Sequence, residues 1–240
     1  MAFLTVLPSF DWLRMDFKLL DIFFQIIVFL FAISVHESAH AWMADRCGDP
    51  TAKMLGRITM NPLKHIDPFG TVLLPVIGLL THAGMFGWAK PTPVTTQNFR
   101  DPVKGDILTT LAGPASNFLL VLLSVFALLL ISNTSLHGQE LVHNVAQGAV
   151  TETQSPLMPI VWLLYTAVYL NVLLGIFNLI PVPPLDGSHV LRHLLPDPVR
   201  QVYDQVGFIG ILLLFTVGSP LVRAFVYPTL GFIDSLLLRV

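Results

Sequence analysis

Long apolar segments alternate with short polar connections along this chain. A membrane-spanning helix needs about 20 apolar residues, and four segments are that long: residues 19–44, 107–131, 159–180 and 206–227. Residues 69–83 are apolar but short, and Pro75 and Gly78 interrupt them, so we expect a re-entrant segment there. The pattern predicts an all-α integral membrane protein, a polytopic helical bundle with a short re-entrant or β-strand element.

Composition supports the membrane assignment and limits the possible partners. Hydrophobic residues make up 54% of the chain and charged residues 12%, whereas a soluble domain carries about 25% charged residues. A chain of 240 residues leaves no room for a second sizeable domain outside the bilayer, so we expect one membrane-embedded domain over residues 1–240. The net charge of −2 gives no sign of a nucleic-acid partner, and a single cysteine excludes an internal disulfide.

The connections differ in charge, which predicts the orientation of the protein in the membrane. Residues 45–105 hold seven of the 13 basic residues, whereas residues 133–157 hold none. By the positive-inside rule, 45–105 face the cytoplasm and 133–157 face outward, with the N-terminus outside. Residues 1–18 mix charged and apolar residues, so we expect them to lie at the interface without a cleavable signal peptide.

A His-Glu-x-x-His pattern, His36 to His40, lies inside the first apolar segment. Two histidines four residues apart lie on one face of a helix, so both imidazoles can reach one metal ion. Glu37 can then take a proton from a metal-bound water, as the general base of a hydrolysis must. Structural histidines are the alternative reading, but ionisable groups at membrane depth usually mark function.

Asp186 is the predicted third metal ligand. A catalytic zinc keeps three protein ligands and one open position. Asp186 lies just past the third long segment, after three prolines that disfavour a helix and before Gly187, which permits a sharp turn. Its carboxylate reaches the His36 and His40 pair only if the first segment runs from outside to inside. A helix N-cap is the alternative role for Asp186.

Further polar residues near these motifs have less certain roles. Asn117 and Asn178 interrupt apolar segments, and an amide there either bonds a neighbouring helix or binds a peptide carbonyl. Four more residues can bind metal, but a helix cap or a polar surface is the simpler explanation for them: His65, Asp67, His189 and His193. Residues 85–94 contain Pro91 and Pro93 and are expected to be extended, with a strand edge that can pair with a peptide.

Three motifs carry a resemblance to the site-2 protease family of intramembrane zinc metalloproteases. They are His36 to His40, Gly113-Pro114-Ala115-Ser116-Asn117, and the stretch from Asn178 to Gly187. The chain is most similar to the compact prokaryotic branch, since it contains neither a PDZ domain nor CBS domains. The resemblance extends over most of the sequence, including Gly87 to Pro91.

The resemblance implies a role for each motif. Zn²⁺ would be held by His36, His40 and Asp186, with Glu37 as the catalytic base. Substrate contacts would come from Asn117, Asn178 and the strand edge that includes Trp88, Ala89 and Lys90. The partners would be the lipid bilayer and a membrane protein cleaved within or near a transmembrane segment. The location would be the inner (plasma) membrane of a prokaryote, with the active site near the cytoplasmic leaflet.

Three other functions are compatible with parts of the pattern. A membrane-embedded zinc hydrolase of lipid-linked or soluble peptides would need the same residues. A metal transporter would place His and Asp in a membrane, but it usually has inverted repeats, which this sequence lacks. A non-catalytic binding protein of the same fold would be expected to lack one of the metal or base residues, and all four are present. The sequence does not indicate an oligomeric state.

Overall fold

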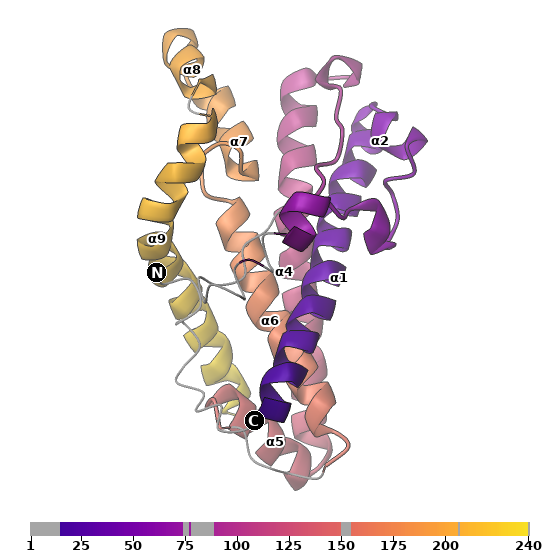
Figure 1. The fold of residues 1–240 in the computed structure, drawn as a ribbon, viewed down its shortest axis with the longest axis vertical. Helices are drawn as coiled ribbons and strands as arrows, with labels where there is room; N and C mark the ends of the chain where they lie inside the picture. Colours follow the sequence, from indigo (N-terminus) through magenta and orange to yellow (C-terminus); the bar gives the residue numbers. More distant parts are fainter. Residues whose placement is uncertain (1–14, 74–76, 78–88, 150–154, 206, 240) are drawn as a thin grey trace.

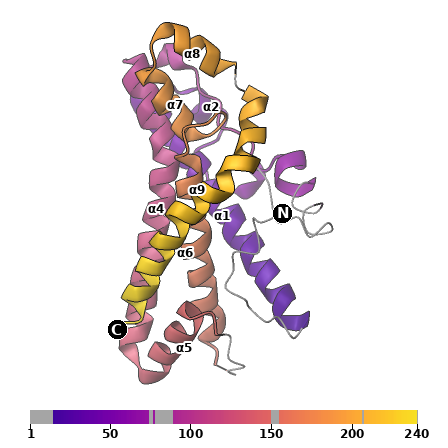
Figure 2. The same cartoon turned by 90° about the vertical axis from the view of Figure 1, so that its left-hand side faces the viewer.

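Four long helices form the body of the protein, as a computed structural model shows for residues 15–73, 77, 89–149, 155–205 and 207–239. They are α1 (Met15–Cys47), α4 (Pro102–Thr134), α6 (Met158–Asn178) and α9 (Gly207–Leu237). Consecutive long helices run in opposite directions (Figure 1), and Figure 2 shows α9 crossing in front of α4 and α6. The described part of the chain contains no strand. The predicted all-α class is confirmed.

Three of these helices are long and apolar enough to cross a membrane, namely Leu20–Cys47, Pro102–Thr134 and Met158–Asn178. Each begins and ends within a few residues of a predicted segment. The predicted last span, 206–227, falls on α9, where the side chains of residues 206–219 lie outside the described part. Most of the predicted re-entrant segment, 69–83, also lies outside it. That segment, the last span and the single domain over 1–240 stay predictions.

Short elements lie at the two ends of the bundle (Figure 1). Helix α5 (Leu136–Ala146) joins α4 to α6 at one end. The opposite end carries most of the remaining elements: α2 (Thr51–Met54), the 3-10 turns η1 (Pro62–Lys64) and η3 (Thr96–Asn98), α7 (Asp186–Leu194) and α8 (Asp197–Asp204). The π-helical turn η2 (Pro68–Leu73) lies nearer the middle of the bundle (Figures 1 and 2). The two ends therefore differ in charge as the sequence predicts, because the basic connection lies at the α2 end.

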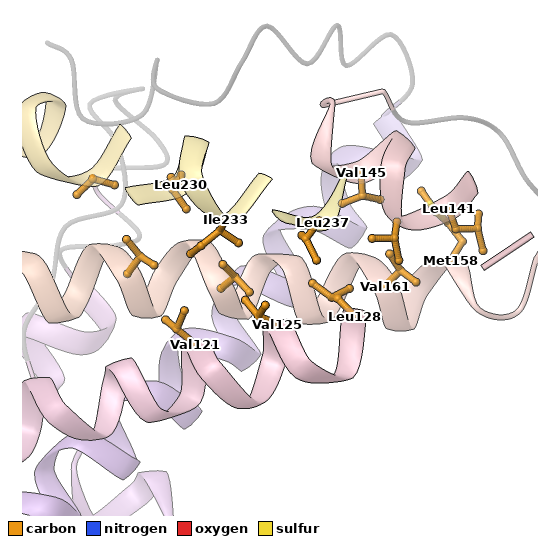
Figure 3. Close-up of a cluster of buried hydrophobic side chains, with 14 residues drawn as sticks. Val121, Val125, Leu128, Leu141, Val145, Met158, Val161, Leu230, Ile233 and Leu237 are labelled. Atoms are coloured by element: carbon orange, nitrogen blue, oxygen red, sulfur yellow. The ribbon is translucent and has the colours of Figure 1, made fainter. Parts of the chain in front are cut away.

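The hydrophobic core lies between α4, α5, α6 and α9 (Figure 3). It includes residues of α5, which is at the opposite end of the bundle from α7 (Figure 1). Leu128, Leu141, Val161 and Leu237 are fully buried within it. Large apolar side chains on the outer faces of α1 and α4 remain exposed, among them Phe31 and Leu122. Apolar residues on both faces of a helix are expected where one face packs on protein and the other on lipid.

The connection between α1 and α4 leaves and returns to the same end of the bundle. The N–H of Arg100 donates to the carbonyl of Cys47 across 3.0 Å. Nearby, buried Asp49 accepts hydrogen bonds from the N–H of Thr95 at 2.7 Å and the amide of Asn98 at 2.8 Å. Burial raises the pKa of Asp49, but these bonds and those from Thr51 outweigh it, so the pKa is lowered. The carboxylate thus ties both ends of the connection together.

Close packing at Gly187 places the start of α7 against the end of α6. A Cβ atom at this position would lie 2.2 Å from the carbonyl oxygen of Leu179, a separation that no side chain tolerates. Leu185 rather than Asp186 occupies the N-cap position, and Asp186 is the first helical residue. The side chain of Asp186 is therefore free of a capping bond and available to the site.

Candidate active site

The structure brings together the three predicted metal ligands, from two helices far apart in sequence. The Nε2 atoms of His36 and His40 on α1 lie 3.0 Å apart. The carboxylate of Asp186 on α7 approaches both, with Oδ2 at 3.2 Å from His36 Nε2 and Oδ1 at 3.4 Å from His40 Nε2. Both imidazoles are at least 90% buried. The group lies near the α2 end of the bundle.

The donor set fits a zinc ion. Ligands about 2.0 to 2.1 Å from a tetrahedral zinc lie about 3.3 Å from one another, close to the three separations observed. Oδ2 of Asp186 is buried and accepts no hydrogen bond within the described part of the chain. Burial raises the pKa of Asp186, but the two facing imidazoles more than offset it, and the pKa is lowered. An ionised carboxylate with a free oxygen is what a metal requires.

The other ring nitrogen of His40 fixes its tautomer. Nδ1 lies 2.7 Å from the carbonyl oxygen of Thr109 on α4. A carbonyl oxygen only accepts hydrogen bonds, so Nδ1 carries the hydrogen and Nε2 offers its lone pair to the site. The sequence analysis did not identify Thr109, because its contact uses the main chain and leaves no residue-type signal.

A chain of amides fixes His36 in the same way. Asn171 on α6 donates its Nδ2 to the carbonyl of Ala167, so its Oδ1 faces Asn117 and accepts from Nδ2 of that residue at 2.9 Å. Oδ1 of Asn117 is then left to accept from Nδ1 of His36 at 2.6 Å. The Ala167 carbonyl thus sets the orientation of the Asn171 and Asn117 amides. Nδ1 of His36 then carries the hydrogen, and its Nε2 offers a lone pair to a metal.

These contacts give Asn117 a role in orienting His36, while the predicted contact with substrate stays a prediction. Asn117 is fully buried and both of its polar atoms are engaged. The sequence analysis did not identify Asn171, although a signal was present. It lies seven residues before Asn178, so both amides share one face of α6.

Gly113 lets α4 approach the histidines. A Cβ atom at Gly113 would lie 2.4 Å from Nε2 of His40 and 2.6 Å from Cε1 of His36. Any side chain here would occupy the space in which the metal ligands meet. The glycine of the Gly-Pro-x-x-Asn motif is therefore required by the shape of the site.

Glu37 is held by Thr92 from the connection between α1 and α4. The N–H of Thr92 donates to Oε2 of Glu37 at 2.8 Å, and its hydroxyl lies 2.7 Å from the same oxygen. The hydroxyl also lies 3.0 Å from the main-chain oxygen of Glu37. Both side-chain contacts use Oε2, so this oxygen is anchored, while Oε1 accepts no hydrogen bond from the described residues.

The residues around Thr92 were predicted to form a strand edge. Ala89 and Lys90 lie in a stretch without regular secondary structure, and the N–H of Lys90 donates to the carbonyl of His65 at 2.8 Å. Pro91 and Pro93 have no N–H, so this part of the stretch offers a peptide only acceptors. Trp88 and the rest of 85–88 lie outside the described residues. Pairing of a substrate here stays a prediction.

The remaining candidates form hydrogen bonds with other groups. Asn178 is half-buried and donates to the carbonyl of Leu174 in its own helix. Nε2 of His65 bonds the carbonyl of Thr59, and Asp67 accepts from the N–H groups of residues 69 and 70, as a helix cap does. His189 and His193 face Asp106 on α4. Asp106 was not among the predicted residues.

Comparison with known proteins agrees with this geometry. The family model described as peptidase family M50 matches residues 24–217. The chain belongs to peptidase family M50. The resemblance to site-2 proteases is thereby confirmed, and with it the expectation of a zinc-dependent protease. No solved structure matches this M50 peptidase.

Curated relatives carry names that assign them to the zinc metalloproteases. YwhC of Bacillus subtilis (strain 168) is 37% identical over 211 residues, which cover 87% of this chain and 86% of the relative. Rip2 of Mycolicibacterium smegmatis is 28% identical over 77% of this chain and 63% of the relative. Rip2 of Mycobacterium tuberculosis (strain H37Rv) is 26% identical over 80% of this chain and 65% of the relative. The names of these relatives agree with the grouping of His36, His40 and Asp186, which could hold a metal ion.

Proposed function

We propose that this M50 peptidase is an intramembrane endopeptidase that binds zinc through His36, His40 and Asp186. The observation that carries the proposal is the meeting of these three side chains, with both histidine Nδ1 atoms bonded to α4 and both Nε2 atoms directed at the carboxylate. The chain supplies three ligands, which leaves a position for water as catalytic zinc sites require.

Zinc bound at this site would polarise the scissile carbonyl and make water more acidic. The protein's own part is to hold the ligands in place and to move the proton. Glu37 follows His36 directly on α1, and Thr92 anchors its Oε2. Oε1 of Glu37 accepts the proton of the attacking water and then delivers it to the leaving amine.

The proposed substrate is a membrane protein cleaved within or near a transmembrane segment. Support comes from the position of the ligands, which lie on or beside helices apolar enough to cross a membrane. A helical peptide bond is shielded by its neighbours and by its own hydrogen bonds, so the substrate must unwind locally. Asn178 and the stretch with Ala89 and Lys90 are proposed to contact the unwound chain.

The proposed location is the inner membrane of a prokaryote, with the site near the cytoplasmic leaflet. The basic residues of the α1 to α4 connection favour this orientation, because the connection includes α2, which lies at the same end of the bundle as α7, the helix that carries Asp186. Residues 133–157 carry no Lys or Arg, and the described ones among them, 133–149 and 155–157, lie at the opposite end, which would face outward.

The decisive experiment combines metal content with two substrates. Purified protein is expected to hold one zinc per chain and to cleave a transmembrane peptide in detergent or liposomes faster than a soluble peptide. Asp186→Ala should lose the zinc, whereas Glu37→Gln should keep the zinc and lose turnover. Equal cleavage of both substrates would instead support a membrane-embedded hydrolase of soluble peptides. Full activity of the Glu37→Gln variant would exclude Glu37 as the catalytic base.

A further inference from the structure

Asp106 lies near the start of α4, where it faces two histidines of α7. Its Oδ2 lies 2.7 Å from Nε2 of His193, and both of its oxygens lie 3.3 Å from Nδ1 of His189. Asp106 is only 6% exposed, and a carboxylate this buried is costly unless it is paired. The two imidazoles provide the pairing, and the bond to Asp106 raises the pKa of His189.

The two histidines share a helix face with the third zinc ligand. His189 and His193 follow Asp186 by three and seven residues on α7, which places all three on one side of that helix. Asp186 reaches the histidines of α1, while the other two reach α4. One face of α7 therefore makes both the ligand contact and the contact that fixes the helix.

On α4, Asp106 belongs to a stripe of residues that shapes the zinc site. Thr109, Gly113 and Asn117 follow it at spacings of three, four and four residues, so the four residues lie on one face. Thr109 and Asn117 orient the two α1 histidines, and Gly113 gives them space. If Asp106 also positions Asp186, then α4 alone positions all three ligands.

Helix α7 needs such a contact because it is short. It has nine residues, and helices of this length are marginal without tertiary support. Two residues of α7 make polar contacts with α8. Arg192 binds the carboxylate of Asp204, and the carbonyl of Ser188 lies 3.4 Å from the hydroxyl of Tyr203, which is nearer to the carbonyl of Pro181, at 3.0 Å. Those contacts hold α7 to another short helix, whereas Asp106 holds it to the body of the protein.

We propose that Asp106, His189 and His193 form a clamp that positions Asp186 over the His36 and His40 pair. Asp106 and His193 are the principal positioning residues, since their contact is the shorter and the more buried. The inference rests on the zinc ligands assigned under Proposed function. It adds that zinc affinity depends on a hydrogen-bonded cluster that does not touch the zinc.

The test measures zinc affinity by competition with a chelator in the full-length purified protein. Asp106→Asn and His193→Gln should each weaken zinc binding by about 10- to 100-fold, as contacts behind metal ligands commonly do. The double variant should bind zinc no more weakly than the weaker-binding single variant, because both substitutions break the same contact between Asp106 and His193. Arg192→Gln is the matched control, since it breaks the bond of α7 to α8 and should leave zinc affinity unchanged.

Hydrogen exchange measures the stability of α7 directly, which an activity assay does not. Amides of residues 186–194 should exchange faster in Asp106→Asn and His193→Gln, while those around His36 keep their rates. If either variant fails to fold, the other decides. Wild-type zinc affinity and wild-type exchange in the folded variants would overturn the clamp. A second zinc equivalent that is lost in His193→Gln would overturn it too, because the cluster would then be a metal site.

Asp186→Ala in the same titration separates this inference from the ligand assignment. If Asp186→Ala keeps its zinc, the ligand assignment fails, whatever the clamp variants do. If Asp186→Ala loses its zinc while Asp106→Asn and His193→Gln bind as the wild type does, only the clamp fails.

Discussion

Thr92 donates its main-chain N–H to Oε2 of Glu37 at 2.8 Å and places its hydroxyl 2.7 Å from the same oxygen. The residues lie 55 positions apart in the sequence. One oxygen of the proposed base is thereby occupied by a segment outside the long helices. The orientation of the carboxylate depends on how the connection between α1 and α4 folds back onto α1.

Thr92→Val should lower kcat with little change in KM. The substitution keeps the N–H donor and the shape of the side chain but removes the hydroxyl, so Glu37 loses one of two anchors. A charge-assisted hydrogen bond contributes about 1.5 to 3 kcal/mol, so a fall in kcat of about 10- to 150-fold is expected. Steady-state cleavage of a transmembrane peptide measures both constants.

Two companion variants show whether the Thr92 hydroxyl is responsible. Thr92→Ser should restore kcat, because it returns the donor. Thr96→Val removes a hydroxyl from the same connection, one that makes no hydrogen bond to Glu37 within the described residues, and should behave as the wild type. A Thr92→Val protein with unchanged kcat would show that the N–H alone suffices.

Asn117→Leu should weaken zinc binding by about 10- to 100-fold. The variant removes the acceptor of Nδ1 of His36 and strands the amide of Asn171 in an apolar environment. Zinc competition with a chelator measures the effect. Asn171→Leu should have a smaller effect, since it leaves the bond between Asn117 and His36 possible. A larger loss in Asn171→Leu would contradict the order of the relay.

Gly113→Ala should abolish zinc binding through steric conflict alone. The added methyl group would meet His40 Nε2 at 2.4 Å, so the imidazoles or α4 must move. Metal content per chain, measured by mass spectrometry, is expected to fall well below one. Gly231→Ala on α9 is the control, because no atom lies within 4 Å of the added carbon. It should keep its zinc and gain up to about 1 kcal/mol in helix stability.

Asp49→Ala should loosen the connection that carries Thr92. Four hydrogen bonds from Thr51, Thr95 and Asn98 end on this carboxylate. Its lowered pKa means that the stabilisation is present above the unfolded pKa near 3.8 and is lost as the pH falls through the lower, folded value. At neutral pH the variant should therefore lose stability and release residues 89–98 to limited proteolysis.

The pH series provides the control for Asp49→Ala. The difference in stability between wild type and variant should be constant from pH 7 to about pH 5 and shrink below about pH 4. Asp67→Ala removes a cap that joins no distant segments, so it should leave proteolysis of 89–98 unchanged. A difference that grows on acidification would contradict the role of the ionised carboxylate.

The membrane-spanning helices and the proposed zinc ligands were predictable because each leaves a local signal. Continuous apolar stretches determine α1, α4 and α6, since a helix satisfies its own backbone in lipid. The spacing of His36 and His40 places two imidazoles on one helix face. The cap formed by Asp67 was equally visible, because the residues that it bonds follow it directly.

The contacts that complete the site have no such signal, and only the tertiary structure decided them. Thr109 uses its carbonyl oxygen, which every residue type possesses. Asp106 and Thr92 meet His193 and Glu37 across separations of 87 and 55 residues. A sequence motif shows which side chains lie together on one face of a helix. Which group of another helix lies opposite depends on how the helices pack, and that is a property of the whole chain.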